Sequence, residues 1–207
     1  MAKERSSYIF NCGTCKTPCN AISKGNYPFE KDLRDAEQEE NILISLINQS
    51  GTYRAEKCQT NGYPDIRVLN NNAETIQYLE VKMQRRAFMK IHKMLPDAQL
   101  HPSETVALNL SDLLRYFNIY AKEKLPISVM WVLKDRPCIT GKSDRCYFAA
   151  NISILQKIYR NDINHSRRFR RRSGEGDVIN GKHLGVTVNY HFLLSELKAW
   201  SPDNLKF

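Results

Sequence analysis

The feature that most constrains the fold is a pair of strand-like segments, residues 64–70 and 75–84, joined by a short polar loop. In the second segment apolar and polar side chains alternate, which is the period of a strand with two different faces. The loop, residues 71–74, is rich in asparagine and has a length typical of a connection between antiparallel strands. The chain is therefore expected to contain a β-hairpin.

This hairpin is expected to bring acidic side chains together. The alternation places Glu80 and Lys82 on the same face of the second strand. Carboxylates directly opposite one another on neighbouring strands, with Cβ atoms about 4.5–5.5 Å apart, repel unless a positive charge lies between them. A divalent cation that prefers oxygen ligands would resolve the repulsion, and Lys82 would hold a water or a phosphate oxygen beside it. The expected register pairs Leu69 with Ile76, Arg67 with Tyr78, and Asp65 with Glu80.

A helix is expected before the hairpin and another after it. The first covers residues 35–48, where the apolar side chains recur at helical spacing, and Gly51 follows as a stop. The second runs from Ser111, a candidate N-cap, to Lys124, and ends before Pro126. The apolar stripe expected on the second helix consists of Leu113, Leu114, Phe117, Tyr120 and Ala121.

Two more strand-like segments complete a mixed α/β core. Residues 52–58 precede the hairpin, and residues 127–133 follow the second helix and are apolar enough to be buried on both faces. The expected order is helix, three-strand meander, helix and strand, within residues 31–134. We find no internal repeat that would suggest a solenoid.

The motif Pro64-Asp65 followed by Glu80-Val81-Lys82 resembles that of the PD-(D/E)XK nuclease superfamily, which includes many restriction endonucleases and archaeal Holliday junction resolvases. The resemblance covers about half of the chain. It implies a restriction-endonuclease-like α/β core with a mixed central sheet of four or more strands flanked by helices. The expected organisation is a single domain with a Cys-containing N-terminal extension (residues 1–30), the nuclease core (31–134) and a basic C-terminal extension packed on it (135–207).

The resemblance also implies roles for individual residues. Asp65 and Glu80 would bind Mg²⁺ or Mn²⁺, and Lys82 would position or activate the attacking water. Members of the family often add a carboxylate from the preceding helix, for which Glu40 fits best because it shares a face with Leu43, Ile44 and Ile47. Glu37 and Glu39 remain alternatives to Glu40. Gln84, two positions beyond the lysine, is a candidate accessory residue.

Charge favours a polyanionic partner. The chain has 31 Lys and Arg against 22 Asp and Glu, a net charge of +9. Basic side chains are concentrated in two stretches, residues 82–93 and 160–172, where the alternative is a solvated basic surface. The candidate contacts to double-stranded DNA are Arg85, Arg86, Lys90, Lys93, Arg167, Arg168, Arg170, Arg171 and Arg172.

The cysteines and the apolar runs indicate the compartment. Three cysteines, Cys12, Cys15 and Cys19, have spacing suited to a zinc knuckle, with Cys58, Cys138 or Cys146 as the fourth ligand. The set of Cys12, Cys15, Cys19 and Cys58 is a candidate for structural Zn²⁺, against the alternatives of unligated thiols or an iron–sulfur cluster. No apolar run approaches the ~20 residues of a membrane span, and no hydrophobic signal core is evident. A cytoplasmic protein that does not enter the membrane is expected.

Together these features predict a Mg²⁺-dependent DNA endonuclease that acts as a homodimer, so that two active sites address two strands. A type II restriction endonuclease is the specific expectation, because some seventy residues beyond the core would leave room to read a DNA sequence. A structure-selective enzyme, such as a Holliday junction resolvase or a repair nuclease, is the first alternative. A non-enzymatic, zinc-stabilised nucleic-acid-binding protein is the alternative from another class.

Overall fold

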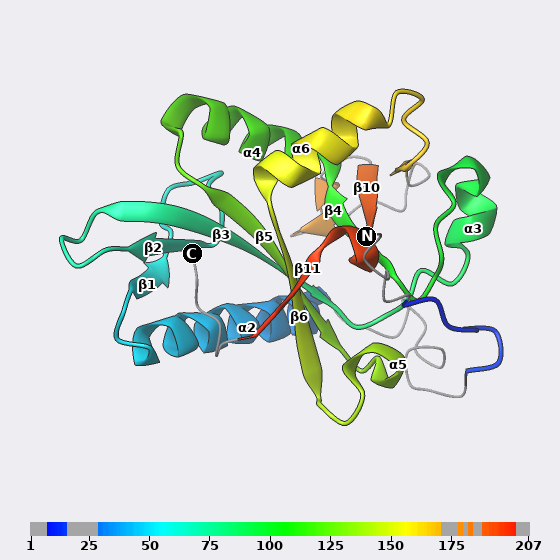
Figure 1. Cartoon of the computed structure of the whole chain (residues 1–207), viewed down its shortest axis with the longest axis horizontal. Coiled ribbons are helices and arrows are strands. Elements are labelled where there is room, and N and C mark those ends of the chain that lie inside the picture. The colour runs from blue at the N-terminus through cyan, green and yellow to red at the C-terminus, as the bar shows by residue number, and fades with distance from the viewer. Residues whose placement is uncertain (1–7, 16–28, 171–177, 180–181, 184–187, 202–207) are drawn as a thin grey trace, which may run out of the picture.

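The central element of the fold is a six-stranded sheet with the order β1-β2-β3-β5-β6-β11 (Figure 1). It is seen in a computed structural model that describes residues 8–15, 29–170, 178–179, 182–183 and 188–201. The strands are β1 (Arg54–Lys57), β2 (Ile66–Leu69), β3 (Thr75–Gln84), β5 (Ile127–Lys134), β6 (Arg145–Asn151) and β11 (Lys198–Trp200).

The sheet is mixed. β1, β2 and β3 form an antiparallel meander, β3 pairs in parallel with β5, and β5, β6 and β11 are antiparallel. Parallel neighbours require a long crossover. Here it contains α3 (Ile91–Met94), η2 (Pro96–Ala98), β4 (Thr105–Asn109) and α4 (Leu110–Glu123). The predicted α/β class, with a mixed sheet flanked by helices, is confirmed.

Helices cover the two faces of this sheet (Figure 1). On one face α2 (Phe29–Gln49) packs Leu43 and Ile47 against Leu79 and Val81 of β3. On the other face α4 and α6 (Ile152–Asn161) pack against the alternate side chains of the same strands, such as Tyr78 of β3 and Trp131 of β5. Alternate side chains of β3 therefore belong to two different cores. Glu80 and Lys82 lie on the face of β3 that is covered by α4.

A smaller sheet lies beside the main one. It has the order β4-β10-β7, with β10 (Val188–Leu193) between β4 and β7 (Arg168–Arg170). The remaining described elements are α5 (Pro137–Thr140), the paired β8 (Val178–Ile179) and β9 (Lys182–His183), and η3 (Leu194–Glu196). Residues 135–207, which the sequence suggests are an extension, thus supply β6 and β11 to the central sheet as well as α6 and β10.

Local geometry departs from the sequence expectation in three places. Arg67 pairs with Tyr78 as expected, but a register shift after Val68 pairs Leu69 with Thr75 in place of Ile76. The second helix begins at Leu110, so that its N-cap is Asn109 and not Ser111. Its buried residues are Leu113, Tyr116 and Phe117, whereas Leu114 of the expected stripe is 38% exposed.

Candidate functional site

Asp65 is held against β3 by backbone hydrogen bonds. It lies directly before β2, and its Oδ2 accepts a hydrogen bond from the Val81 N–H at 2.8 Å. Its own carbonyl accepts a hydrogen bond from the Cys58 N–H at 2.8 Å. The register of β2 and β3, continued by one residue, places Asp65 opposite Glu80. The two carboxylates are therefore brought together by the hairpin, and the Val81 N–H fixes the direction of one of them.

Glu80 is engaged through both of its carboxylate oxygens although it is only 2% exposed. Lys82 Nζ lies 2.5 Å from Oε1, and the Tyr116 hydroxyl donates to Oε2 at 2.5 Å. Lys82 reaches back along its own strand, whereas Tyr116 comes from α4. The site thus joins the hairpin to the crossover helix.

The first half of α4 supplies further polar groups to the site. Asp112 Oδ2 lies 3.9 Å from Lys82 Nζ, and Asp112 Oδ1 accepts a hydrogen bond from Arg115 Nη2 at 2.6 Å. The Arg115 side chain is 42% exposed, so its guanidinium lies at the solvent side of the cluster. We call Asp65, Glu80, Lys82, Asp112 and Tyr116 the carboxylate cluster.

The three acids considered on α2 have different surroundings. Glu37 is exposed and accepts a hydrogen bond from Lys57 at 2.7 Å. Glu39 is fully buried and pairs with two cations on β5 and β6. Glu40 lies 3.5 Å from Lys57 and interacts electrostatically with Asp65 and Glu80. Among these acids, Glu40 is the one that the structure couples to the carboxylate cluster.

Gln84 continues the same face of β3, and its accessory role stays a prediction. Its Nε2 donates to the carbonyls of Arg86 and Thr105, both at 3.0 Å. The amide therefore ties the end of β3 to the start of β4. This contact is structural, and it gives Gln84 no described bond to the carboxylate cluster.

Burial raises the pKa values of three carboxyls in and beside the cluster. Burial raises the pKa of Glu80 to about 7, and Asp65 adds to that effect against the opposing action of Lys82 and Tyr116. Burial likewise raises the pKa of Asp65, against the Val81 N–H and Lys82. Burial also raises the pKa of Glu40. Although burial alone would lower the pKa of Lys82, the neighbouring carboxylates raise it overall, so Lys82 is a cation here.

The donor chemistry of this cluster fits a hard divalent cation. Mg²⁺ is commonly held by one or two carboxylates, with water and phosphate oxygens completing its octahedron. Asp65 and Glu80 provide that pair, with Glu40 coupled to both. Nowhere in the described part of the chain do three His, Cys, Asp or Glu side chains group so as to hold a metal. A cation held by Asp65 and Glu80 would complete its coordination with water and phosphate oxygens, as Mg²⁺ commonly does.

The cysteines show no such grouping either, within the same described ranges. Cys12 is buried and Cys15 half-buried near the N-terminus, whereas Cys58 packs against the core shared by α4 and α6. Cys19 lies outside the described residues. The described members of the expected zinc set are therefore not arranged as three ligands of one ion. Cys146, a candidate fourth ligand, is partly buried, and this burial raises the pKa of its thiol.

The candidate DNA contacts divide into engaged and exposed residues. Arg85 pairs with Asp35 at 2.9 Å, and Arg168 lies over the Tyr159 ring at 5.3 Å and donates to its hydroxyl. Lys90, Lys93 and Arg170 are exposed, and Arg86 is half-buried. Arg171 and Arg172 lie outside the described residues. The exposed cations of the expected set therefore lie at the start of α3, within α3 and at the end of β7.

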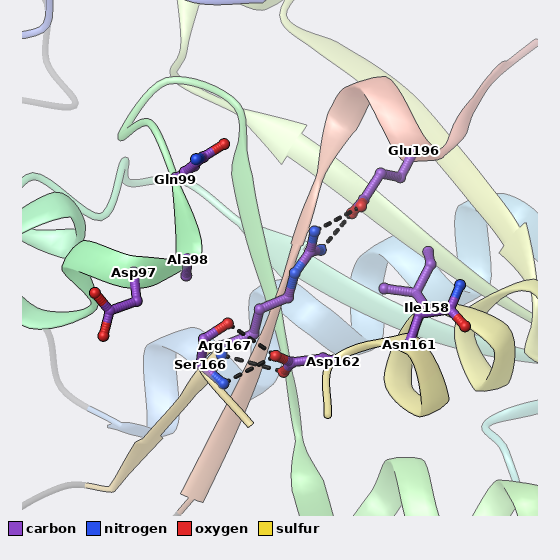
Figure 2. Close-up of a pocket in the computed structure, with 9 residues that line it drawn as sticks. All are labelled: Asp97, Ala98, Gln99, Ile158, Asn161, Asp162, Ser166, Arg167 and Glu196. Atoms are coloured by element: carbon purple, nitrogen blue, oxygen red, sulfur yellow. Dashed lines mark hydrogen bonds and ion pairs between the residues drawn. The ribbon is translucent and has the colours of Figure 1, made fainter. Parts of the chain in front are cut away.

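Arg167 has a structural role that the sequence did not indicate. Its two terminal nitrogens bind both oxygens of Glu196, at 2.7 and 2.8 Å. The pair borders a hollow of about 310 Å³ in which Asp162 also accepts hydrogen bonds from Ser166 (Figure 2). None of the residues that line this hollow belongs to the carboxylate cluster. Glu196 thus engages both terminal nitrogens of Arg167, whose contact with DNA stays a prediction.

The cluster also contains residues that sequence analysis missed. Asp112 and Tyr116 of the cluster, and Arg115 on its solvent side, belong to the second predicted helix, but the apolar stripe assigned to its core omitted Tyr116. Their spacing at i, i+3 and i+4 places them on one helix face, which is a polar face beside the apolar one. That spacing was the available indication. It does not by itself say that the face meets β3.

Solved structures that resemble this chain include a resolvase and a viral nuclease. The chain is similar to Hjc of Archaeoglobus fulgidus, a Holliday junction resolvase from an archaeal hyperthermophile, with 12% identity and a TM-score of 0.41 over 78% of this chain and 86% of that chain. It is similar to D212, a nuclease from a fusselovirus, with 7% identity and a TM-score of 0.40 over 86% of this chain and 88% of that chain. No family model and no curated protein sequence matches. None of the helices in the described residues is long and apolar enough to cross a membrane.

Proposed function

We propose that this chain is a metal-dependent DNA endonuclease of the PD-(D/E)XK superfamily. The observation that carries the proposal is the junction of Asp65, Glu80 and Lys82 at adjacent strands, with the lysine ammonium 2.5 Å from Glu80. The Val81 N–H, between Glu80 and Lys82, binds Asp65 at 2.8 Å. Two acids and a lysine thus converge at one place, although like charges directly opposite one another destabilise a hairpin. The proposal is also supported by the resemblance of the sequence motif to that of the PD-(D/E)XK superfamily and by the mixed central sheet.

Asp65 and Glu80 would hold the cation, Mg²⁺ or Mn²⁺, and Glu40 would add negative charge from α2. A bound divalent cation supplies Lewis acidity toward the phosphate oxygens and neutralises charge as the phosphodiester bond breaks. The hydrogen bond from the Val81 N–H keeps the Asp65 carboxylate directed along β3. The protein therefore contributes a rigid pair of oxygen donors.

Lys82 would act as a positively charged group that orients water and phosphate. Its pKa is raised by the surrounding carboxylates, so it carries its proton and donates hydrogen bonds. Its side chain is 32% exposed, which leaves the ammonium accessible to water. An ammonium so placed stabilises charge that develops on the phosphate in the transition state. The proton of the attacking water would pass to solvent or to a phosphate oxygen.

The substrate would be double-stranded DNA, consistent with the net charge of +9. Phosphates must approach a cluster that is locally negative, and exposed cations around α3 would offset that repulsion. The expectation of a type II restriction enzyme depended on spare C-terminal residues. Because β6, α6, β10 and β11 are built into the fold, we propose the endonuclease activity and leave sequence-specific and structure-selective cleavage as results to be distinguished by assay.

The test is cleavage of circular plasmid with Mg²⁺, with Mn²⁺ and with EDTA. The variants Asp65→Asn, Glu80→Gln and Lys82→Ala should each lose cleavage by about 10²–10³-fold or more while retaining DNA binding. Asp144→Asn is the matched control, because its side chain is 71% exposed and lies outside the cluster. Cutting by Lys82→Ala at the wild-type rate would overturn the assignment.

The form of the products separates the finer alternatives. Discrete plasmid fragments indicate a restriction enzyme, and cleavage confined to four-way junctions indicates a resolvase. Binding of DNA with no cleavage in any metal indicates the non-enzymatic protein. We also propose that the protein is a homodimer, because two active sites could then cut the two DNA strands. Analytical ultracentrifugation would show the dimer, and cleavage of both strands at one place would show that its two sites act together.

A further inference from the structure

Tyr116 has an environment that core packing alone does not require. It is 2% exposed, and its hydroxyl donates to Glu80 Oε2 at 2.5 Å. Buried hydroxyls need a partner, but a backbone carbonyl would satisfy one at less electrostatic cost than a buried carboxylate. The chosen partner is instead the acid that also binds Lys82 through its other oxygen.

The helix that carries Tyr116 is itself firmly anchored. Leu113 and Phe117, on either side of Tyr116, are buried in the core that α4 shares with β5 and α6. The Arg115 guanidinium lies 5.3 Å from the centre of the Tyr116 ring. Packing and this cation–π contact restrict the ring, so the hydroxyl is directed at Glu80 before any ligand arrives.

We propose that Tyr116 is a positioning residue that holds one oxygen of Glu80 so that the carboxylate is presented to a divalent cation in a single orientation. This inference rests on the proposed function, because it takes Glu80 as a cation ligand. Hydrogen bonds that orient a ligating carboxylate typically contribute about 10–100-fold to metal affinity or activity. Tyr116 acts through Glu80 and does not touch substrate.

The test compares the wild-type protein with Tyr116→Phe, which removes only the hydroxyl. Mn²⁺ affinity of the full chain, measured by calorimetry without DNA, should fall by about 10-fold or more. In plasmid cleavage the Mn²⁺ concentration for half-maximal rate should rise by a similar factor, and the KM for DNA should stay unchanged. A residue that only supported the fold would not separate metal affinity from the KM for DNA.

Tyr190→Phe is the matched control. Tyr190 is fully buried, and its hydroxyl donates to a carboxylate, Asp162 Oδ2, at 2.9 Å, but that carboxylate is outside the cluster. It should lose stability as Tyr116→Phe does and keep its Mn²⁺ affinity. If Tyr116→Phe is destabilised, affinity is compared at a temperature at which circular dichroism shows the wild type and both variants folded, and there Tyr116→Phe should still bind Mn²⁺ more weakly than Tyr190→Phe.

The outcomes distinguish the inference from the proposed function. Wild-type Mn²⁺ affinity in folded Tyr116→Phe, together with loss of affinity in Glu80→Gln, overturns the role of Tyr116 alone. Unchanged Mn²⁺ binding in both Asp65→Asn and Glu80→Gln overturns the proposed metal site and with it this inference. An equal loss of affinity in Tyr190→Phe would show that the effect is structural and overturn the positioning role.

Discussion

Glu39 and Glu40 are neighbours on α2, yet they lie in opposite kinds of electrostatic surroundings. Glu39 is fully buried and binds Lys134 Nζ and Arg145 Nη1, each at 2.8 Å. Glu40 lies 3.5 Å from Lys57, and burial together with the acids near it raises its pKa. The first carboxylate is satisfied by cations of the protein. The second is half-buried, pairs with a single lysine and interacts with the buried acids Asp65 and Glu80.

The difference indicates which acidic cluster is structural and which is poised for a ligand. A buried charge that is paired and hydrogen-bonded costs little further, and removing its partner is expensive. A cluster whose carboxylates raise one another's pKa values is destabilised unless something positive binds. Burial alone does not separate the two, because Glu39 and Glu80 are both buried. The separation comes from the number and placement of the cations.

The largest effect is expected from removing the charge of Glu39, which pairs with Lys134 and Arg145. Glu39→Gln leaves Lys134 and Arg145 without their shared carboxylate and should lower the free energy of unfolding by about 3 kcal/mol. This is the lower part of the usual range, because Arg145 keeps Asp144 at 2.8 Å. Glu40→Gln should change stability by less than about 1 kcal/mol. Urea unfolding at pH 7 measures both, and equal losses would remove the distinction.

An intermediate effect is expected when pH changes the charge of Glu80. Its pKa in the fold is about 7, above the ordinary value of 4.5, so the fold retains the proton that the unfolded chain has lost between those values. The stability that Glu80 contributes is therefore largest below pH 4.5 and is lost as pH rises through about 7.

Metal binding responds with the opposite sign, because a cation needs the ionised carboxylate. Mn²⁺ affinity should increase by about tenfold between pH 6 and pH 8, as the ionised fraction of a group with this pKa rises. Calorimetry at a series of pH values checks this. If the Mn²⁺ affinity of Glu80→Gln rose by the same factor between pH 6 and pH 8, the titrating group would be one other than Glu80.

The smallest effect is expected at the rim of the carboxylate cluster. Arg115 is 42% exposed and pairs with Asp112, and in the proposed function it would meet a phosphate of the DNA. Arg115→Ala should weaken DNA binding by about 3–10-fold and reduce the salt dependence by about one counterion. Binding is measured over several salt concentrations without a divalent cation. Lys198→Ala, which removes an exposed cation on the edge strand β11, should leave binding unchanged, and an equal loss there would show only a net-charge effect.

Much of the core was predictable because its cause is local. The period of two in β3, the helical period in α2 and the apolar run of β5 each indicate their element without reference to the rest of the chain. The same alternation predicts that Glu80 and Lys82 share a face. The register of the hairpin was predictable near Arg67 and failed at Leu69, where a bulge replaces regular pairing.

Other features required contacts between distant segments. Arg167 occurs in a dense basic run, and nothing local indicates that Glu196 would occupy both of its terminal nitrogens. The strands β6 and β11 lie outside the segment that resembles a nuclease core, although they complete its sheet. Arg167 and Glu196 lie on separate segments, as do β6 and β11, so composition and periodicity carry no information about these pairings.

The sequence by itself determined the α/β class, the hairpin and the presence of two acids and a lysine on its strands, because side-chain alternation follows from the geometry of an extended chain. Only the tertiary structure decided that α4 delivers Tyr116 to Glu80 and that Glu39 and Glu40 have different partners. Those outcomes depend on how a helix is rotated and which strands lie beneath it. Rotation and neighbours are set by packing of the whole core, which no local pattern specifies.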